Sequence, residues 1–132
     1  MGGTDVRPCA TRRGREAESI SASYLEEQGI VLLSRNYRGP VGEIDIIGID
    51  SGMVCFIEVR SRQSSRFVDP ISTISPAKQQ RIINTAVAFL IRAYDGKFQK
   101  YPCRFDVIIL IVKTPKMPRV TWVKDAFRLP TY

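Results

Sequence analysis

The 132-residue sequence contains no histidine, and this absence excludes several catalytic classes. Ser-His-Asp and Cys-His sites, histidine general bases and the usual zinc hydrolase centres all require imidazole. Cysteine is scarce: Cys9, Cys55 and Cys103 are far apart and form no CxxC pair, which argues against a disulfide framework and a structural zinc site. Cys55 and Cys103 lie in apolar segments and are expected in the core. Enzymatic chemistry would therefore need carboxylates, Lys, Arg or Tyr, with a hard, oxygen-bound cation as any catalytic metal.

Long apolar segments are also absent. The longest uninterrupted apolar run, residues 107–112, is far shorter than the roughly 20 residues that a membrane-spanning helix needs. No apolar segment typical of a signal peptide stands near the N-terminus. We therefore expect a cytoplasmic protein with no membrane partner. The length predicts one domain, placed at residues 14–132, after a disordered basic tail at residues 1–13.

Acidic residues are outnumbered by basic ones. The sequence has 20 Lys and Arg against 13 Asp and Glu, a formal net charge of +7. One interpretation is that the excess positive charge serves only to keep the protein soluble. The other is a polyanionic partner such as nucleic acid, because cations that contact phosphates gain affinity by releasing counterions.

The apolar pattern predicts an α/β protein. Helical spacing occurs over residues 14–29 and 76–94, and Ser75-Pro76 is a typical helix start. Strands are predicted at residues 30–38, 41–49, 53–60, 104–112 and 119–123, followed by a short terminal helix at residues 124–127. The order α-β-β-β-α-β-β predicts a mixed central sheet flanked by helices.

Two carboxylates interrupt the central hairpin. Asp45 lies in the apolar strand 41–49 and Glu58 in the apolar strand 53–60, with Gly52 supplying the positive φ of the turn between them. An unpaired charge buried in such a strand costs several kcal/mol or more. Asp45 and Glu58 are 13 residues apart, which suits adjacent strands across a short turn.

A shared divalent cation would explain this pair. Two neighbouring carboxylates repel one another, and Mg²⁺ between them removes the repulsion. Arg60 lies two residues beyond Glu58, on the same face of the strand, where it could hold a phosphate. The alternative is structural, with Asp45 and Glu58 in ion pairs or at a sheet edge. Asp106, in the apolar segment 104–112, could likewise face this site or pair with a basic group.

Basic and polar side chains cluster beside these elements. Candidate nucleic-acid contacts are Arg35, Arg38, Arg62, Lys78, Gln79 and Arg81. Three of them stand in the first turns of helix 76–94, where a cation opposes the helix dipole, and this hints at an anionic neighbour. Solvated surface side chains are the alternative for each. Glu18, in helix 14–29, is a solvated carboxylate in the simplest interpretation.

The segments GEIDII and FIEVRSR resemble the paired motif of PD-(D/E)xK, or restriction-endonuclease-like, nucleases. More narrowly, residues 14–112 are similar to the YraN-type putative endonucleases, typified by GEIDLI and FVEVK strands. The resemblance implies a fold similar to Holliday-junction resolvases. It implies Asp45 and Glu58 as ligands of Mg²⁺ or Mn²⁺, Glu18 as a third acid and Arg60 in place of the motif's Lys.

The resemblance implies a metal-dependent endonuclease acting on DNA, including branched DNA, with a homodimer expected by analogy to resolvases. Arg60 keeps the charge of the usual Lys but cannot exchange a proton, and Lys78 could reach the site in its place. A second hypothesis is a nucleic-acid-binding or accessory module with a nuclease fold and a weakened site. A third is a protein-interaction domain whose strand acids form ion pairs.

Overall fold

The computed structural model describes residues 12–63, 69, 71–94, 102–112 and 118–128. The elements are α1 (Arg12–Glu27), β1 (Val31–Gly39), β2 (Gly42–Asp50), β3 (Met53–Arg62), η2 (Ile71–Thr73), α2 (Pro76–Tyr94), β4 (Cys103–Ile111) and β5 (Arg119–Phe127). Residues 1–11, most of the expected basic tail, lie outside the described residues. Helix α1 begins at Arg12, two residues before the predicted start.

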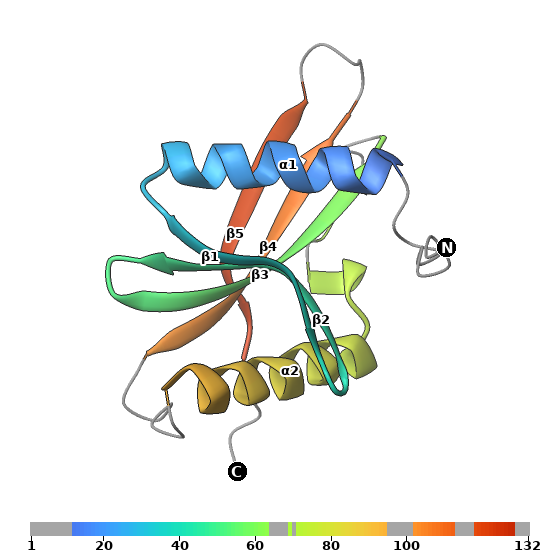
Figure 1. The fold of residues 1–132 in the computed structure, drawn as a ribbon. Coiled ribbons are helices and arrows are strands. Elements are labelled where there is room, and N and C mark those ends of the chain that lie inside the picture. Colours follow the sequence, from blue (N-terminus) through green and yellow to red (C-terminus); the bar gives the residue numbers. More distant parts are fainter. Residues whose placement is uncertain (1–11, 64–68, 70, 95–101, 113–117, 129–132) are drawn as a thin grey trace, which may run out of the picture.

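The five strands form one mixed sheet in the order β1-β2-β3-β4-β5. Strands β3 and β4 are parallel, and the other three neighbouring pairs are antiparallel. Figure 1 shows α1 covering one face of this sheet and α2 the other. The parallel pair requires a crossover, which α2 supplies. The predicted α/β fold with a mixed central sheet is confirmed.

Local signals in the sequence explain the element boundaries. The Ser75 hydroxyl accepts a hydrogen bond from the Lys78 N–H at 3.1 Å, so Ser75 caps α2 as expected. Gly29, with φ of 93°, follows the end of α1. Ser51 and Gly52, both with positive φ, form a two-residue turn between β2 and β3. Two positive-φ central residues match the type I′ turn that suits hairpin twist.

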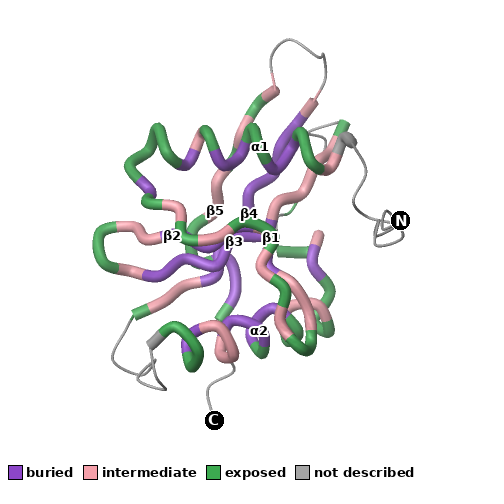
Figure 2. Tube along the Cα trace, in the orientation of Figure 1, coloured by how far each residue is buried: buried purple, intermediate pink, exposed green. Residues whose placement is uncertain are grey.

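Each helix packs on its own apolar face of the sheet. The α2-side core includes Ile44, Ile47, Val54, Phe56, Phe105, Val107 and Ile109 from the strands and Ile82, Ile83, Ala86 and Leu90 from the helix. The α1-side core includes Ile46, Cys55, Ile57 and Ile108 together with Ala22 and Leu25. Figure 2 shows the buried segments concentrated in the central strands. Burial raises the pKa of Cys55 to about 12, so its thiol is unreactive.

Strands β1 and β2 diverge from the sheet as a ribbon. Pairing of β2 with β3 ends at Ile46 and Ile57, and Figure 1 shows the β1–β2 ribbon bending toward α2. Gly39 and Gly42 at its tip lie against Thr85 of α2. A Cβ on Gly42 would be 3.1 Å from the Thr85 hydroxyl oxygen. The close approach of backbone to helix therefore requires small residues at the tip.

The predicted terminal helix at residues 124–127 is wrong, because β5 continues to Phe127. Asp125 has a φ of 57°, and the register with β4 shifts between Phe105 and Val107. Its N–H donates to Asp106, so the irregular backbone keeps a partner and the strand resumes. On α1, Ile20 is 37% exposed and Ala22 is buried.

Gly48→Ala should destabilise the protein by about 1–3 kcal/mol, the usual cost of overpacking. A Cβ at this position would be 2.6 Å from Cγ2 of the buried Ile30 and 3.1 Å from the Val31 carbonyl oxygen. Urea unfolding measures the change. Adding Ile30→Leu, which removes the branched methyl group, should recover part of the loss. An unchanged midpoint for Gly48→Ala would contradict this packing.

Candidate metal centre

Asp45 lies where β2 and β3 separate. The last strand pair on this side is Ile46 with Ile57, so the residue before Ile46 has no ladder partner on β3. Its carboxylate accepts the Val59 N–H instead, at 2.8 Å from Oδ2. The side chain of Asp45 thus bridges the two strands at the start of the split. This hydrogen bond to the backbone holds the side chain in place.

Glu58 is buried on the α2 side of β3. Glu58 is 5% exposed. Phe56, two positions earlier and therefore on the same face of β3, belongs to the α2-side core. Lys78, from the first turn of α2, places Nζ 2.8 Å from Glu58 Oε2. Arg60 is a more distant partner, with its nearest nitrogen 3.6 Å from the same oxygen. The carboxylate therefore has two cationic neighbours from two elements.

Asp45 and Glu58 are close enough to interact directly. Burial, the negative charge of Glu58, a hydrogen bond between the two carboxyl groups and the charge of Glu18 raise the pKa of Asp45 to about 8. The hydrogen bond from Val59 acts in the opposite direction and does not offset them. At neutral pH this pair retains a proton, because two buried carboxylates cannot both ionise cheaply. The site lacks positive charge at Asp45.

Glu18 approaches from α1 and is buried, so the simplest sequence interpretation, a solvated carboxylate, is wrong. Its Oε1 accepts the Asn36 amide at 2.8 Å and Arg35 Nε at 3.3 Å. Arg35 also donates to the Ser19 hydroxyl at 3.0 Å. These contacts attach α1 to β1 next to the acidic pair.

Asn36 is a residue that sequence reasoning did not select. It has a φ of 54°, and the β1–β2 register places it opposite Asp45, since the residues on either side of each are paired. Glu18, Asn36 and Asp45 therefore stand in a row across α1, β1 and β2. The sequence signal that could have identified Asn36 is its place within a predicted strand, because Asn is depleted in strands and tolerates positive φ.

The other predicted nucleic-acid contacts differ in how they relate to the acidic pair. Arg38 and Arg81 are exposed, and Arg81 lies beside the tip of the β1–β2 ribbon at Gly42. Arg62 donates to the carbonyl of the preceding residue. Gln79 donates to a backbone carbonyl just before α2. Lys78 is the member of the predicted set that reaches Glu58.

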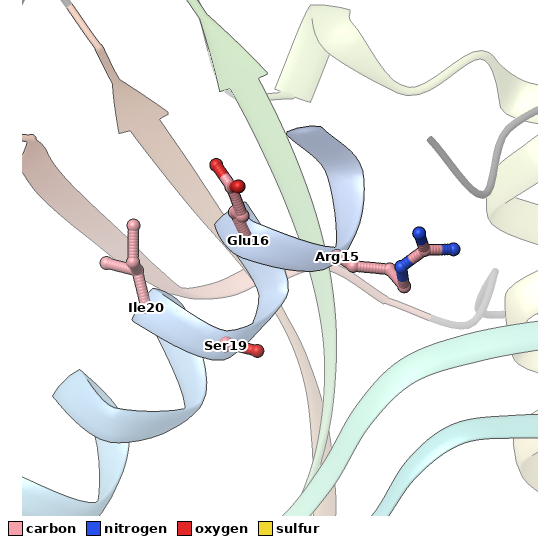
Figure 3. A pocket seen from close by; sticks show the side chains of 4 residues that line it. All are labelled: Arg15, Glu16, Ser19 and Ile20. Carbon is pink, nitrogen blue, oxygen red and sulfur yellow. The ribbon is translucent and has the colours of Figure 1, made fainter. Parts of the chain in front are cut away.

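Two surface hollows have linings that include neither Asp45 nor Glu58. The first, about 400 Å³, follows α1 and is lined by Arg15, Glu16, Ser19 and Ile20. Figure 3 shows Arg15 pointing away from Glu16. The second, about 650 Å³, is lined by Met53, Cys103, Arg104, Phe105, Lys124, Asp125, Phe127 and Arg128. Met53 is five residues from Glu58, which corresponds to roughly 16 Å along a strand.

Asp106 belongs to a separate ion-paired network. Its carboxylate accepts Arg104 Nε at 3.0 Å, Trp122 Nε1 at 2.9 Å and the Asp125 N–H at 2.9 Å. Arg104 also reaches Asp50 at 2.7 Å, and this hydrogen bond lowers the pKa of Asp50. The sequence left two interpretations of Asp106, and the structure shows the second, pairing with a basic group. Its buried charge is compensated, unlike that of Asp45.

The donor set at the ribbon split fits a hard divalent cation. Within the described residues no group of three or more His, Cys, Asp or Glu side chains could hold a metal ion, and Asp45 and Glu58 are two carboxyl groups that interact directly. Mg²⁺ is typically held by one or two carboxylates, with water and substrate phosphate completing its octahedron. A cation here would supply the positive charge that Asp45 lacks.

Comparison with known proteins identifies the family. Residues 17–110 match the uncharacterised protein family UPF0102. A UPF0102 protein of Nitrosococcus oceani is 42% identical over 125 residues, covering 94% of this chain and 98% of the relative. UPF0102 proteins of Nitrosomonas europaea and Pseudomonas putida are each 38% identical, over 89% of this chain and 95% and 93% of their own lengths. The chain therefore belongs to the UPF0102 family.

Proposed function

We propose that this protein is a Mg²⁺- or Mn²⁺-dependent endonuclease that hydrolyses DNA phosphodiester bonds, including those of branched DNA. The observation that carries the proposal is the acidic pair at the ribbon split. Asp45 and Glu58 interact closely, and burial together with the negative charge of Glu58 raises the pKa of Asp45 to about 8. A purely structural Asp45 would be expected to have a cationic partner, as Asp106 and Glu58 have.

Each side chain has a distinct task in this proposal. Asp45 and Glu58 hold the cation, which when bound supplies a nucleophilic water and stabilises charge on the phosphoryl oxygens. Arg60 lies beside Glu58 with its side chain 24% exposed, and its guanidinium can donate to the scissile phosphate. The water oxygen bonds to phosphorus and one P–O bond breaks, giving a phosphate monoester and an alcohol. Glu18 assists by fixing Asn36 and the ribbon beside Asp45.

The charge distribution supports a nucleic-acid substrate. The chain carries a formal charge of +7, and Arg35, Arg38 and Arg81 are exposed on or beside the ribbon that contains Asp45. Phosphate contacts of this kind position a duplex without reading its sequence. Binding should therefore weaken steeply with salt, as counterion release requires.

The test is cleavage of plasmid and four-way-junction DNA with Mg²⁺ or Mn²⁺. Wild-type protein should cleave only with the metal, and the double variant Asp45→Asn, Glu58→Gln should show no more product than a metal-free reaction. Glu26→Gln, which removes an exposed carboxylate of α1, is the matched control and should cleave normally. Metal-dependent cleavage that persists in the double variant would overturn the mechanism.

Arg60 supports a second candidate, a nucleic-acid-binding or accessory module with a weakened site. Arginine remains charged and cannot exchange protons at neutral pH. Salt-dependent DNA binding without cleavage, in both the wild type and Arg60→Lys, would favour this function.

The helices in the described part of the chain are too short or too polar to cross a membrane. A homodimer and a cytoplasmic location stay predictions, testable by ultracentrifugation and cell fractionation.

A further inference from the structure

We propose that Lys78 is an internal counter-ion that competes with the divalent cation for Glu58 and that cation binding releases it toward the substrate phosphate. The inference rests on the proposed metal site and adds a role that the family motif does not assign. Lys78 comes from α2, whereas the motif's own cation position is Arg60 on β3. Its Nζ lies 2.8 Å from Glu58 Oε2.

Glu58 needs a cation in the metal-free protein. The side chain is 5% exposed, and a buried carboxylate without a partner is strongly unfavourable. Lys78 supplies the shorter contact, while Arg60 stays 3.6 Å away and leaves its Nε unbonded. The ammonium therefore stands on an oxygen that a divalent cation would also use. Two positive ions cannot share that oxygen without repelling each other.

The position of Lys78 makes it the partner that can leave. Its side chain is 34% exposed, against 24% for Arg60, and it sits in the first turn of α2. The positive end of the helix dipole opposes a cation there, so the attraction of Glu58 must hold it. A flexible four-carbon stem with three donors can move a short distance into solvent at little cost.

Release of Lys78 would link metal loading to substrate binding. Once a divalent cation occupies Glu58, the ammonium is repelled outward, away from the buried carboxylate. It then stays within reach of an anion docked over the site, such as a DNA phosphate, which also attracts it. Lys78 would thus lower metal affinity in the absence of DNA and raise affinity for DNA in the presence of metal.

The experiment measures Mn²⁺ binding calorimetrically, without DNA, in wild type, Lys78→Met and Lys78→Arg. Lys78→Met should bind Mn²⁺ roughly fivefold more tightly, the factor expected from loss of one ion pair whose lysine is 34% exposed. Lys78→Arg should stay near wild type because the charge is retained. Arg92→Met removes an equal charge from the exposed other end of α2 and should not change Mn²⁺ affinity. The Mn²⁺-induced rise in melting temperature should be larger for Lys78→Met than for wild type.

The DNA arm tests the second half of the inference. In saturating Ca²⁺, Lys78→Met should bind junction DNA several-fold more weakly than wild type. Equal or weaker Mn²⁺ affinity in Lys78→Met, with Arg92→Met normal, would overturn the competition while leaving the proposed function intact. If neither wild type nor Lys78→Met binds Mn²⁺, the metal site and the proposed function fail together. A Lys78→Met protein that does not fold is replaced by Lys78→Gln, for which the same results apply.

Discussion

Asp45→Asn should abolish metal-dependent cleavage and, at the same time, make the metal-free protein more stable. We expect a cleavage rate lower by about 10³-fold or more, since loss of one carboxylate removes half of the protein's proposed ligands. We expect a gain in unfolding free energy on the order of 2–5 kcal/mol at pH 9, since Asn carries no charge to desolvate. Asn can still accept the Val59 N–H that holds the two strands together.

The stability gain should depend on pH in a defined direction. The pKa of Asp45 is about 8 in the folded protein against an ordinary value of 3.8. Between these values the folded chain binds a proton that the unfolded chain has lost, so stability falls as pH rises. The slope is at most about 1.4 kcal/mol per pH unit and levels off above pH 8. The unfolding free energy of Asp45→Asn lacks this pH dependence, so the difference in stability between the variant and the wild type should grow from pH 4 to pH 8.

Denaturant unfolding at pH 5, 7 and 9, with and without Mg²⁺, measures this pattern. Mg²⁺ should stabilise the wild type increasingly toward pH 9 and should leave Asp45→Asn unchanged. Glu26→Gln, with an exposed carboxylate removed, should follow the wild type throughout. A variant that is less stable than wild type at pH 9 would mean that the charge of Asp45 is already compensated inside the protein.

Asp106→Asn should have the opposite effect and cost about 3–5 kcal/mol. Asp106 is fully buried, and its carboxylate accepts hydrogen bonds from Arg104, Trp122 and the Asp125 N–H. An Asn amide would turn a donor toward one of these donors and would remove one of the two carboxylates that pair with Arg104. The same chemical change at two strand aspartates therefore separates a compensated charge from an uncompensated one.

Thermal and urea unfolding at pH 7 test this second prediction. Asp125→Asn is the matched control, because Asp125 lies in the same network but is exposed at its pair with Arg128, and Asn tolerates its positive φ. The control should change stability by less than about 1 kcal/mol. Metal binding by Asp106→Asn protein that remains folded should be normal. A loss below about 1 kcal/mol would show that the buried network is unimportant.

The central hairpin and its acids could be predicted from the sequence because their signals are local. A glycine turn, β-branched strands and two carboxylates inside apolar runs specify the turn and the unusual positions of Asp45 and Glu58. The helix cap at Ser75 is equally local. Membership of the UPF0102 family agrees with the resemblance that these segments carry.

Contacts between distant segments could not be predicted in this way. Lys78 reaches Glu58 because α2 connects β3 to β4 and begins close to Glu58. The position of the helix start relative to this carboxylate cannot be predicted from sequence spacing. Asn36 joins Glu18 because the ribbon bends at a positive-φ residue. Residues 124–127 continue β5 instead of forming the predicted helix, because the irregularity at Asp125 is stabilised by Asp106 on another strand. Tertiary hydrogen bonds outweighed local propensity at these positions.

An anomalous difference map from a Mn²⁺-soaked crystal tests the central claim most directly. A peak within about 2.5 Å of carboxylate oxygens from both Asp45 and Glu58, with Lys78 Nζ displaced from its 2.8 Å contact, is the predicted result. A map with no peak between these two side chains, at Mn²⁺ concentrations that support cleavage, would contradict it.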